Sequence, residues 1–476
     1  MENVEITVWR KLTVIFTIRH MGKEKTMQNQ EIFKKPVWEA IFSMGIPSLI
    51  SVLVMIIYNM ADMYFIGFLN DYTQVAAVSL IMPVFSIMTA VSMLLGNGGC
   101  TLIAQALGAG EKKRARSYMS LCIWTAILLG VIIAGLIIVF SNPLLKFLGT
   151  NEEMWQYARN YMLILAVGSP AMLLNYEIAC LVRGEGAIKP GLIANFVSTG
   201  MNILLDPVLI LGVKMGVSGA ALATVLSNVI GIVYLIWYKM HHEMILTFNP
   251  KPARESVRHL GRVFALGFPN AISNILNGFA STFSNQLLVL YGTSAVAAMA
   301  AAGKATMIVG LLQMGLCMGV QPLMAYYYGA GDMRRIKEVV MKLFILTLGI
   351  GVVFGAVGML GSKALVGLFI RDLEVVELGQ KIVCIQLLSA PFVGIYYIGQ
   401  NFMQATGSAL MATITSVLRQ GVLLIPLLYI MNAIMKMMGI PTAHVMADFI
   451  SIVVTSVLTV IIYKKVKNQL KQKREA

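Results

Sequence analysis

The segment LGAGEKKR at residues 107–114 recurs as YGAGDMRR at residues 328–335. The two segments lie 221 residues apart, which is close to half of the 476-residue chain. The same spacing, or one residue more, relates three further pairs: Pro170 and Pro391, Gly186 and Gly407, and GIP at 45–47 and GFP at 267–269. Self-similarity at a fixed spacing indicates repeated structural units. The chain is therefore predicted to consist of two halves with the same fold.

Both halves are strongly apolar. Hydrophobic side chains make up 58% of the chain and Asp, Glu, Lys and Arg only 12%, whereas soluble domains carry about 25% charged residues. A transmembrane helix needs about 20 apolar residues, so twelve crossings take about 240; 58% of 476 residues supplies about 276. The runs are far longer than the alternating segments of about ten residues in an outer-membrane barrel. We expect an all-α integral membrane protein and not a soluble enzyme.

Apolar runs between Gly, Pro and charged residues predict twelve transmembrane helices. They cover residues 41–66, 75–104, 119–140, 157–181, 191–212, 217–238, 263–290, 296–324, 339–361, 381–404, 411–435 and 445–463. The halves are thus two pseudo-symmetric six-helix lobes, an N-lobe at 37–238 and a C-lobe at 263–463, joined by a loop at 239–262. Six crossings per half make the repeats parallel, with a cleft between the lobes as in alternating-access carriers.

Membrane topology explains the net charge of +15. With the N-terminus inside, the cytoplasmic segments hold 27 Lys and Arg residues and the external loops hold six. Because positive residues favour the cytoplasmic side, we expect a plasma-membrane protein with both termini in the cytoplasm and no nucleic-acid partner. The tails are residues 1–36, expected to be mobile, and the basic residues 464–476. The five cysteines form no CxxC pair and indicate neither a zinc site nor a disulfide framework.

Two acidic residues, Asp62 and Asp206, lie at similar depth in the outer third of the N-lobe. A charge inside the membrane costs about 2.5 to 3.5 kcal/mol, so each needs a partner or a function. Asn202 lies one helical turn before Asp206, and Thr224 has a similar depth on the next helix. Asp62, Asn202, Asp206 and Thr224 offer the oxygen ligands that suit Na⁺. A proton fits equally, because burial and a like-charged neighbour favour a neutral carboxyl. The alternative is two structural acids satisfied by neighbouring amides and hydroxyls.

Proline marks two candidate bending points near these acids. Pro207 directly follows Asp206, and Pro47 lies early in the first predicted helix. A proline frees the carbonyl one turn earlier and kinks a helix. The cation site is expected in the first lobe only, because the repeat spacing aligns the two acids with Ser284 and Leu427.

Other intramembrane polar residues suggest a substrate cavity and ion pairs. The chain has 33 methionines, and flexible thioethers with aromatic faces suit varied apolar cations. Glu177 is expected to pair with Arg183, and Asp448 with Arg419 or Lys304 at the base of the cleft. The candidate cavity residues are Tyr58, Asn59, Met60, Gln286 and Gln313.

Four motifs carry a resemblance to a known family: YNMAD at 58–62, LGAG at 107–110, RGEG at 183–186 and NILLDP at 202–207. Over residues 38–463 the chain resembles the multidrug and toxic compound extrusion (MATE) transporters, in their DinF-like and MepA-like branch. The resemblance implies a two-lobed twelve-helix fold that exports cationic drugs by antiport with H⁺ or Na⁺ and needs no cofactor. By motif match, Asp62 and Asp206 are the family's first- and fifth-helix aspartates, and Pro47 is the proline about which the first helix bends. The resemblance adds Asn175 to the polar cluster with Asn202 and Thr224. We expect a monomer.

Two other classes are weighed against this interpretation. A lipid-linked oligosaccharide flippase on a related two-lobed scaffold would need a wide basic cleft, whereas here the intramembrane acids gather in one lobe. An enzyme would need a catalytic motif, and the sequence contains no HExxH, G-x-S-x-G or phosphate loop. A receptor would normally carry a soluble domain, for which 464–476 is too short.

Overall fold

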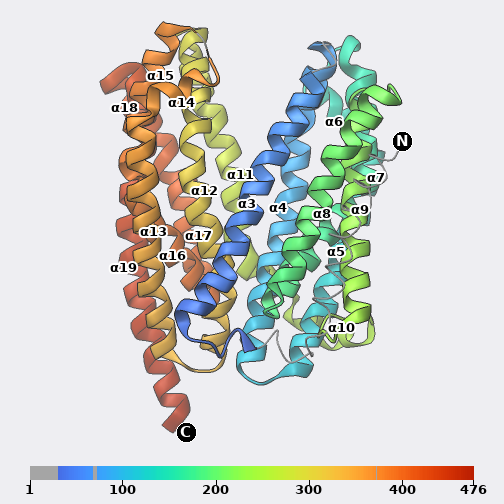
Figure 1. Ribbon diagram of the computed structural model, residues 1–476, viewed down its shortest axis with the longest axis vertical. Helices are drawn as coiled ribbons and strands as arrows, with labels where there is room; N and C mark the ends of the chain where they lie inside the picture. The colour runs from blue at the N-terminus through green and yellow to red at the C-terminus, as the bar shows by residue number, and fades with distance from the viewer. Residues whose placement is uncertain (1–30, 68–71, 371, 476) are drawn as a thin grey trace, which may run out of the picture.

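The computed structural model describes residues 31–67, 72–370 and 372–475, without the side chains at 56, 58–67, 72 and 473–475. Two bundles of long helices lie side by side (Figure 1). The N-lobe contains α3 (Val37–Gly67), α4 (Tyr72–Gly108), α5 (Lys112–Val139), α7 (Glu152–Gly184), α8 (Ile188–Pro207) with a π-helical extension at Val208–Gly212, and α9 (Val217–His241), besides the short α6 (Ser141–Phe147). The loop between the lobes holds α10 (Lys251–Ser256).

The C-lobe repeats this order with more interruptions. Its helices are α11 (Leu260–Val289), α12 (Thr293–Gly329), α13 (Met333–Leu360), the short α14 (Ser362–Gly367), α15 (Leu373–Gln386) followed by α16 (Ala390–Ala405), α17 (Ala409–Val417) followed through a π-helical segment at Leu418–Leu423 by α18 (Leu424–Met435), and α19 (Gly439–Glu475). The predicted helix at 381–404 is therefore formed by two helical pieces, and the one at 411–435 by three.

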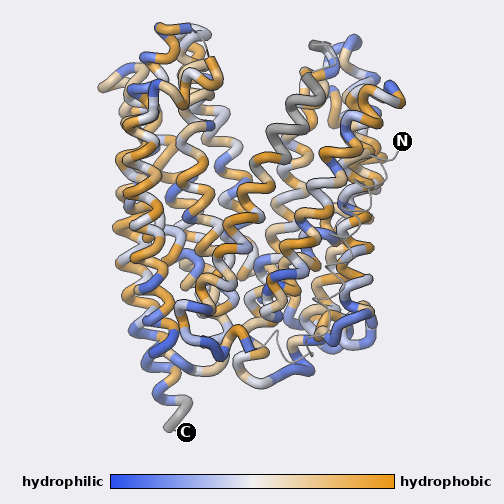
Figure 2. The backbone as a smooth tube through the Cα atoms, in the orientation of Figure 1, coloured by the Kyte–Doolittle hydropathy of each residue, from blue (hydrophilic) through white to orange (hydrophobic). Residues whose placement is uncertain are grey.

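The twelve-helix, two-lobe fold class is confirmed. Ten helical stretches among the described residues are long and apolar enough to cross a membrane. One of them, Ala409–Gln472, holds two crossings, because the chain turns back at Lys436–Met438 before α19. The remaining crossing is α11, which is not among the ten and carries Asn270, Asn277 and Ser284. Hydrophobic residues fill the middle of both bundles, and hydrophilic residues gather at the helix ends (Figure 2).

Paired turns at one end of the molecule show why the repeat has its sequence. Gly110 and Gly331 have φ angles of +78° and +72°, a conformation that favours glycine. After each glycine the chain makes the same closing hydrogen bond, Glu111 N to Ala106 O and Asp332 N to Tyr327 O. This is the Schellman pattern that ends a helix. We call this end the basic end; it comprises the turns 109–111, 185–187, 330–332 and 406–408, the loop 242–250 and the C-terminal part of α19.

The lobes approach each other most closely toward the basic end and lean apart toward the other end (Figure 1). A Cβ on Gly108 of α4 would overlap the carbonyl oxygen of Tyr326 on α12, and a Cβ on Gly329 of α12 would overlap that of Gln105 on α4. The second contact is the first one moved by 221 residues in both partners. The repeated LGAG and YGAG segments are thus the two halves of a pseudo-symmetric contact between the lobes.

A second close approach lies one to three turns further along α4. A Cβ on Gly98 would overlap Val263 O of α11, and one on Gly267 would overlap Leu94 O. Both obstacles are backbone atoms, which a side-chain rotation cannot remove. The two lobes therefore depend on the absence of side chains at these positions to reach their observed separation.

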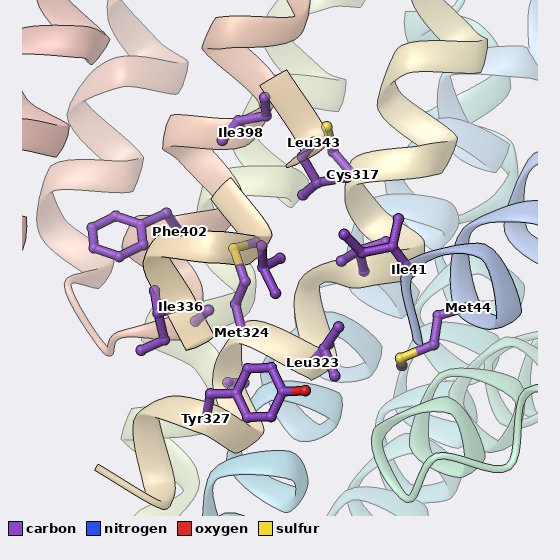
Figure 3. Close-up of a cluster of buried hydrophobic side chains, with 14 of the residues drawn as sticks. Ile41, Met44, Cys317, Leu323, Met324, Tyr327, Ile336, Leu343, Ile398 and Phe402 are labelled. Atoms are coloured by element: carbon purple, nitrogen blue, oxygen red, sulfur yellow. The ribbon is translucent and has the colours of Figure 1, made fainter. Parts of the chain in front are cut away.

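Apolar side chains fill the space on the other side of this contact, between α3 of the N-lobe and α12, α13 and α16 of the C-lobe (Figure 3). Ile41 and Met44 of α3 are fully buried in the same cluster as Leu323 and Tyr327 of α12. Burial of each such side chain contributes about 1.5 to 3 kcal/mol relative to water. This cluster stabilises the closed arrangement of the lobes at the basic end.

A buried seam of amides crosses the lobe boundary beside the cluster. Gln321 Nε2 of α12 donates to Thr101 Oγ1 of α4 at 3.2 Å and to Gln404 Oε1 of α16 at 2.7 Å. Gln105 Nε2 of α4 donates to the Ala405 carbonyl oxygen at 2.8 Å. The side chains of Gln404 and Asn270 are hydrogen-bonded to each other at 3.2 Å. Polar groups buried in this way need partners, so separating the lobes here requires the seam to rearrange.

Both predicted tails are shorter than expected. Residues 1–30 lie outside the described residues, but Phe33 is fully buried, stacks on Tyr326 at 4.3 Å, and accepts a hydrogen bond from Arg335 Nη1 at its carbonyl oxygen. The expectation of a mobile tail up to residue 36 is therefore wrong for its last residues. At the other end, α19 runs on to Glu475, and Val466 is buried.

We expect Gly267→Ala to destabilise the contact between the lobes, since the new methyl group meets the Leu94 carbonyl oxygen. Overpacking of this kind costs about 1 to 3 kcal/mol. Gly278→Ala is the matched control on the same helix, because nothing lies within 4 Å of its Cβ position. Thermal unfolding of the purified protein should show a lower midpoint for Gly267→Ala only; equal midpoints would contradict the packing described.

Candidate functional site

The buried acid Asp206 lies at the end of α8, in contact with amide and hydroxyl groups. Asp206 is 0% exposed, Asn202 one turn earlier is 1% exposed, and Thr224 of α9 is 7% exposed. A carboxylate only accepts hydrogen bonds, which orients the Asn202 amide with its nitrogen toward the acid. That nitrogen then donates to Asp206 Oδ2 at 3.1 Å, and the amide oxygen accepts from Thr224 N at 3.2 Å. The predicted trio is therefore brought together.

A hydrogen-bond chain extends this cluster toward α7. Asn175 Nδ2 donates to Asn228 Oδ1 at 2.9 Å and to Ser198 Oγ at 3.3 Å, and Asn228 Nδ2 donates to the Thr224 carbonyl oxygen at 2.8 Å. Asn175 thus joins the cluster through Asn228 rather than directly. Asn228 and Ser198 were missing from the prediction, although each lies one helical turn from a predicted residue, Thr224 or Asn202.

Several predicted residues of the first helix lie outside the described side chains. Asp62, Tyr58, Asn59 and Met60 belong to the helical backbone of α3, which packs against α8. Their part in the ion site and the cavity stays a prediction. Among the residues whose side chains are described, no group of three His, Cys, Asp or Glu could hold a metal ion. A sodium ion at Asp206 would therefore have to use amide and hydroxyl oxygens as well.

The two candidate bending points differ in their surroundings. α3 continues as a helix through Pro47. At Pro207 the α-helix ends, and the π-helical segment Val208–Gly212 follows directly. Short π-helical turns are rare and occur frequently at functional sites. The bending role of both prolines stays a prediction.

The C-lobe holds a cavity of about 200 Å³ among α11, α12, α16, α19 and the π-helical segment after α17. Arg419 and Asp448 line it and form a salt bridge, with both Arg419 Nε and Nη2 at 2.8 Å from Asp448 Oδ1. Ser389 Oγ donates to Asp448 Oδ2 at 2.8 Å. The guanidinium also lies over the ring of Tyr396, 4.4 Å from its centroid. The predicted pairing of Asp448 with one of two basic residues is thus made with Arg419.

The two glutamines proposed for the substrate cavity have different places. Gln313 of α12 lines the C-lobe cavity and is fully buried; its Nε2 donates to the carbonyl oxygens of Thr347 and Ala390 at 2.9 and 2.8 Å. Gln286 is exposed on α11 and is not among the residues that line this cavity. Lys304, the other basic candidate, lies over the ring of Phe369 instead.

The predicted ion pair between Glu177 and Arg183 is wrong. Glu177 is fully buried and faces the Cys122 thiol of α5, whereas Arg183 Nη2 donates to Cys180 Sγ at 2.9 Å. The physical reason is the spacing: six residues along a helix put two side chains about 120° apart, and only residues three or four apart are neighbours.

Glu185, in the RGEG motif, fastens the loop between the lobes. Its Oε1 accepts a hydrogen bond from Ile245 N at 2.8 Å, and only 3% of the residue is exposed. Burial raises the pKa of this carboxyl to about 7, although the Ile245 amide and the nearby cations Lys239 and Arg116 act in the opposite direction. Its ionisation is therefore disfavoured as long as the loop stays docked.

Comparisons with known proteins agree with the architecture. The MatE family model matches twice, at residues 47–208 and 269–430, once in each lobe at a spacing of 222 residues. The multidrug export protein MepA of Staphylococcus aureus (strain NCTC 8325 / PS 47) is 33% identical over 427 residues, covering 89% of this chain and 94% of that protein. MepA of Staphylococcus saprophyticus is 31% identical over 431 residues, with the same shares covered.

Solved structures show the same fold. An outward-facing multidrug resistance MATE family transporter of the MOP superfamily superposes with a TM-score of 0.88 at 22% identity, covering 94% of this chain and 100% of that one. A MATE protein in its bent conformation gives a TM-score of 0.87 with the same identity and coverage. The chain belongs to the MatE family. It is accordingly a membrane transporter and not an enzyme.

We expect docking of the loop at 242–250 to weaken as the pH rises. Because the pKa of Glu185 is about 7 when docked and about 4.3 in an unfolded chain, its stabilising effect is complete below pH 4 and is lost as the pH passes 7. The change amounts to about 3 kcal/mol. Glu185→Gln should abolish this dependence in hydrogen exchange of the loop amides, corrected for intrinsic rates.

Glu243→Gln, which changes an exposed acid of the same loop, is the control and should keep the wild-type pH dependence. An unchanged pH dependence in Glu185→Gln would show that another group governs the docking.

Proposed function

We propose that this transporter exports organic cations and other xenobiotics from the cell by antiport with H⁺ or Na⁺, which binds at Asp206 together with Asp62. The observation that carries the proposal is the fully buried Asp206 carboxylate, held by the neutral amide of Asn202 inside an apolar lobe. Maintaining a carboxylate in such a place is costly, so a function that requires it is favoured. The MepA relatives are named multidrug export proteins, which supports drugs as the cargo.

Both coupling ions fit the cluster, but they require different rearrangements. A proton on Asp206 would turn one carboxyl oxygen into a donor, and the Asn202 amide would rotate to offer its oxygen. A sodium ion would need the same rotation and would add the hydroxyl oxygen of Thr224, which lies 3.5 Å from that amide. In either case Asn202 exchanges its hydrogen bond to the acid for one to Thr224, which changes the contact between α8 and α9.

The energy available from one ion matches the task. Export against a 100-fold concentration difference costs about 2.7 kcal/mol. A monovalent ion that crosses a membrane potential of 100 mV supplies about 2.3 kcal/mol, and its concentration gradient adds to this. One ion per drug molecule is therefore sufficient for substantial accumulation outside.

The basic end is the cytoplasmic end in this proposal, because Lys and Arg of the connecting turns concentrate there. Both chain termini then lie in the cytoplasm, the transporter resides in the plasma membrane, and the lobes, which lean apart at the opposite end, face outward. We propose that it acts as a monomer. The rival flippase function would need several cavity cations for a pyrophosphate, whereas Arg419, which lines the C-lobe cavity, is already paired with Asp448.

We expect Asp206→Asn to reduce gradient-driven efflux of ethidium from proteoliposomes by at least about tenfold, because the amide can take up neither ion as the carboxylate does. Efflux should be measured under a sodium gradient alone and under a pH gradient alone, which also identifies the ion. Glu39→Gln, which alters an exposed acid on α3, is the control. Undiminished efflux in Asp206→Asn under both gradients would refute the coupling site.

A further inference from the structure

The polar groups of the C-lobe cavity have a different chemistry from the cluster around Asp206. The N-lobe cluster presents an acid among amides and hydroxyls. In the C-lobe cavity the acid, Asp448, already accepts three hydrogen bonds, two from Arg419 and one from Ser389. Its charge is therefore engaged within the protein. A ligand in this cavity does not find an available carboxylate there.

The cavity instead offers hydrogen-bond donors of Arg419. A guanidinium carries five N–H groups in a planar fork, and Asp448 takes only the edge formed by Nε and Nη2. The opposite edge, which ends in Nη1, is directed away from Asp448. Because Arg419 lines the cavity, these remaining donors suit an acceptor group such as a carboxylate, which pairs with a guanidinium through parallel hydrogen bonds.

An unpartnered acceptor lies in the same cavity. Gln313 is 0% exposed, and its Nε2 is fully used by two backbone carbonyls. Its Oε1 is buried and has no hydrogen-bond partner among the described residues. A buried polar atom without a partner is costly, so a ligand that donates an N–H group to it would be stabilised. Aromatic and thioether surface from Tyr397 and Met307 completes the lining.

We propose that the C-lobe cavity is a second binding site, which takes the carboxylate end of aromatic zwitterions, with Arg419 as the carboxylate partner and Gln313 Oε1 as an acceptor for an N–H donor. A volume of about 200 Å³ holds a benzoate-sized group, and the cavity is not closed on all sides. A larger ring system can therefore extend out of it. The transport of such zwitterions rests on the proposed function, but their binding does not.

Rhodamine 110 and rhodamine 123 test the site, because the second dye is the methyl ester of the first and lacks only the free carboxylate. Binding to the purified full-length protein is measured by fluorescence anisotropy at pH 7 without any ion gradient. We expect Arg419→Gln/Asp448→Asn to weaken rhodamine 110 binding about tenfold or more, since a charge-assisted hydrogen bond is lost. Rhodamine 123 binding should stay within about twofold.

The double variant removes both charges together, because removing one alone would leave the other buried without a partner. Lys342→Gln, which removes a C-lobe cation that does not line the cavity, should bind both dyes as the wild type does. If the double variant fails to elute as a single species, Arg419→Lys replaces it; the ammonium lacks the planar fork, so rhodamine 110 should again lose affinity selectively.

Equal loss of both dyes, or no loss of rhodamine 110, overturns the proposal. The measurement uses no gradient, so a failure of antiport at Asp206 would leave its outcome unaffected. Conversely, a normal cation efflux with no carboxylate discrimination would refute this site while the proposed function stands.

Discussion

The whole arrangement depends on the distance at which α4 of one lobe meets α11 and α12 of the other. Glycine at 98, 108, 267 and 329 lets backbone approach backbone, and no larger residue fits without moving a helix. This contact brings Thr101 and Gln105 within reach of the C-lobe amides, and it buries the apolar cluster of α3 and α12. The ion cluster and the C-lobe cavity each lie within one lobe, so changes at this boundary can move them as rigid bodies.

The two lobes have the same architecture but use it for different electrostatics. In each of them a buried polar cluster lies where the fourth, fifth and sixth helices meet. The N-lobe version surrounds Asp206 with neutral groups, whereas the C-lobe version contains the ion pair of Arg419 and Asp448. A π-helical segment adjoins Asp206 and another contains Arg419. One duplicated scaffold therefore provides an environment for a cation and a separate one of mixed polarity.

The fold was predictable because run length and the repeat are properties of the linear sequence. Asp206, Asn202 and Thr224 were predictable as neighbours, since one helical turn or one shared depth relates them. The partner of Asp448 could not be chosen, because Arg419 and Lys304 lie on other helices and only packing selects between them. Glu177 was paired incorrectly where helical spacing was not applied. The glycine contacts escaped prediction, because nothing in a sequence says which backbone a glycine will face.

The glycine contacts also bear on how easily the lobes can part. Where a Cβ would overlap a carbonyl oxygen, the glycine instead points a Cα hydrogen at that oxygen, as in the weak Cα–H···O bonds common between close helices. Each such bond is worth about 0.5 to 1 kcal/mol. The carbonyls involved also accept from their own helices, so parting leaves no strong donor or acceptor stranded in the membrane. The lobes are thus joined by adhesion that is individually weak and reversible, and a single ion-binding event is of the right energy to release it.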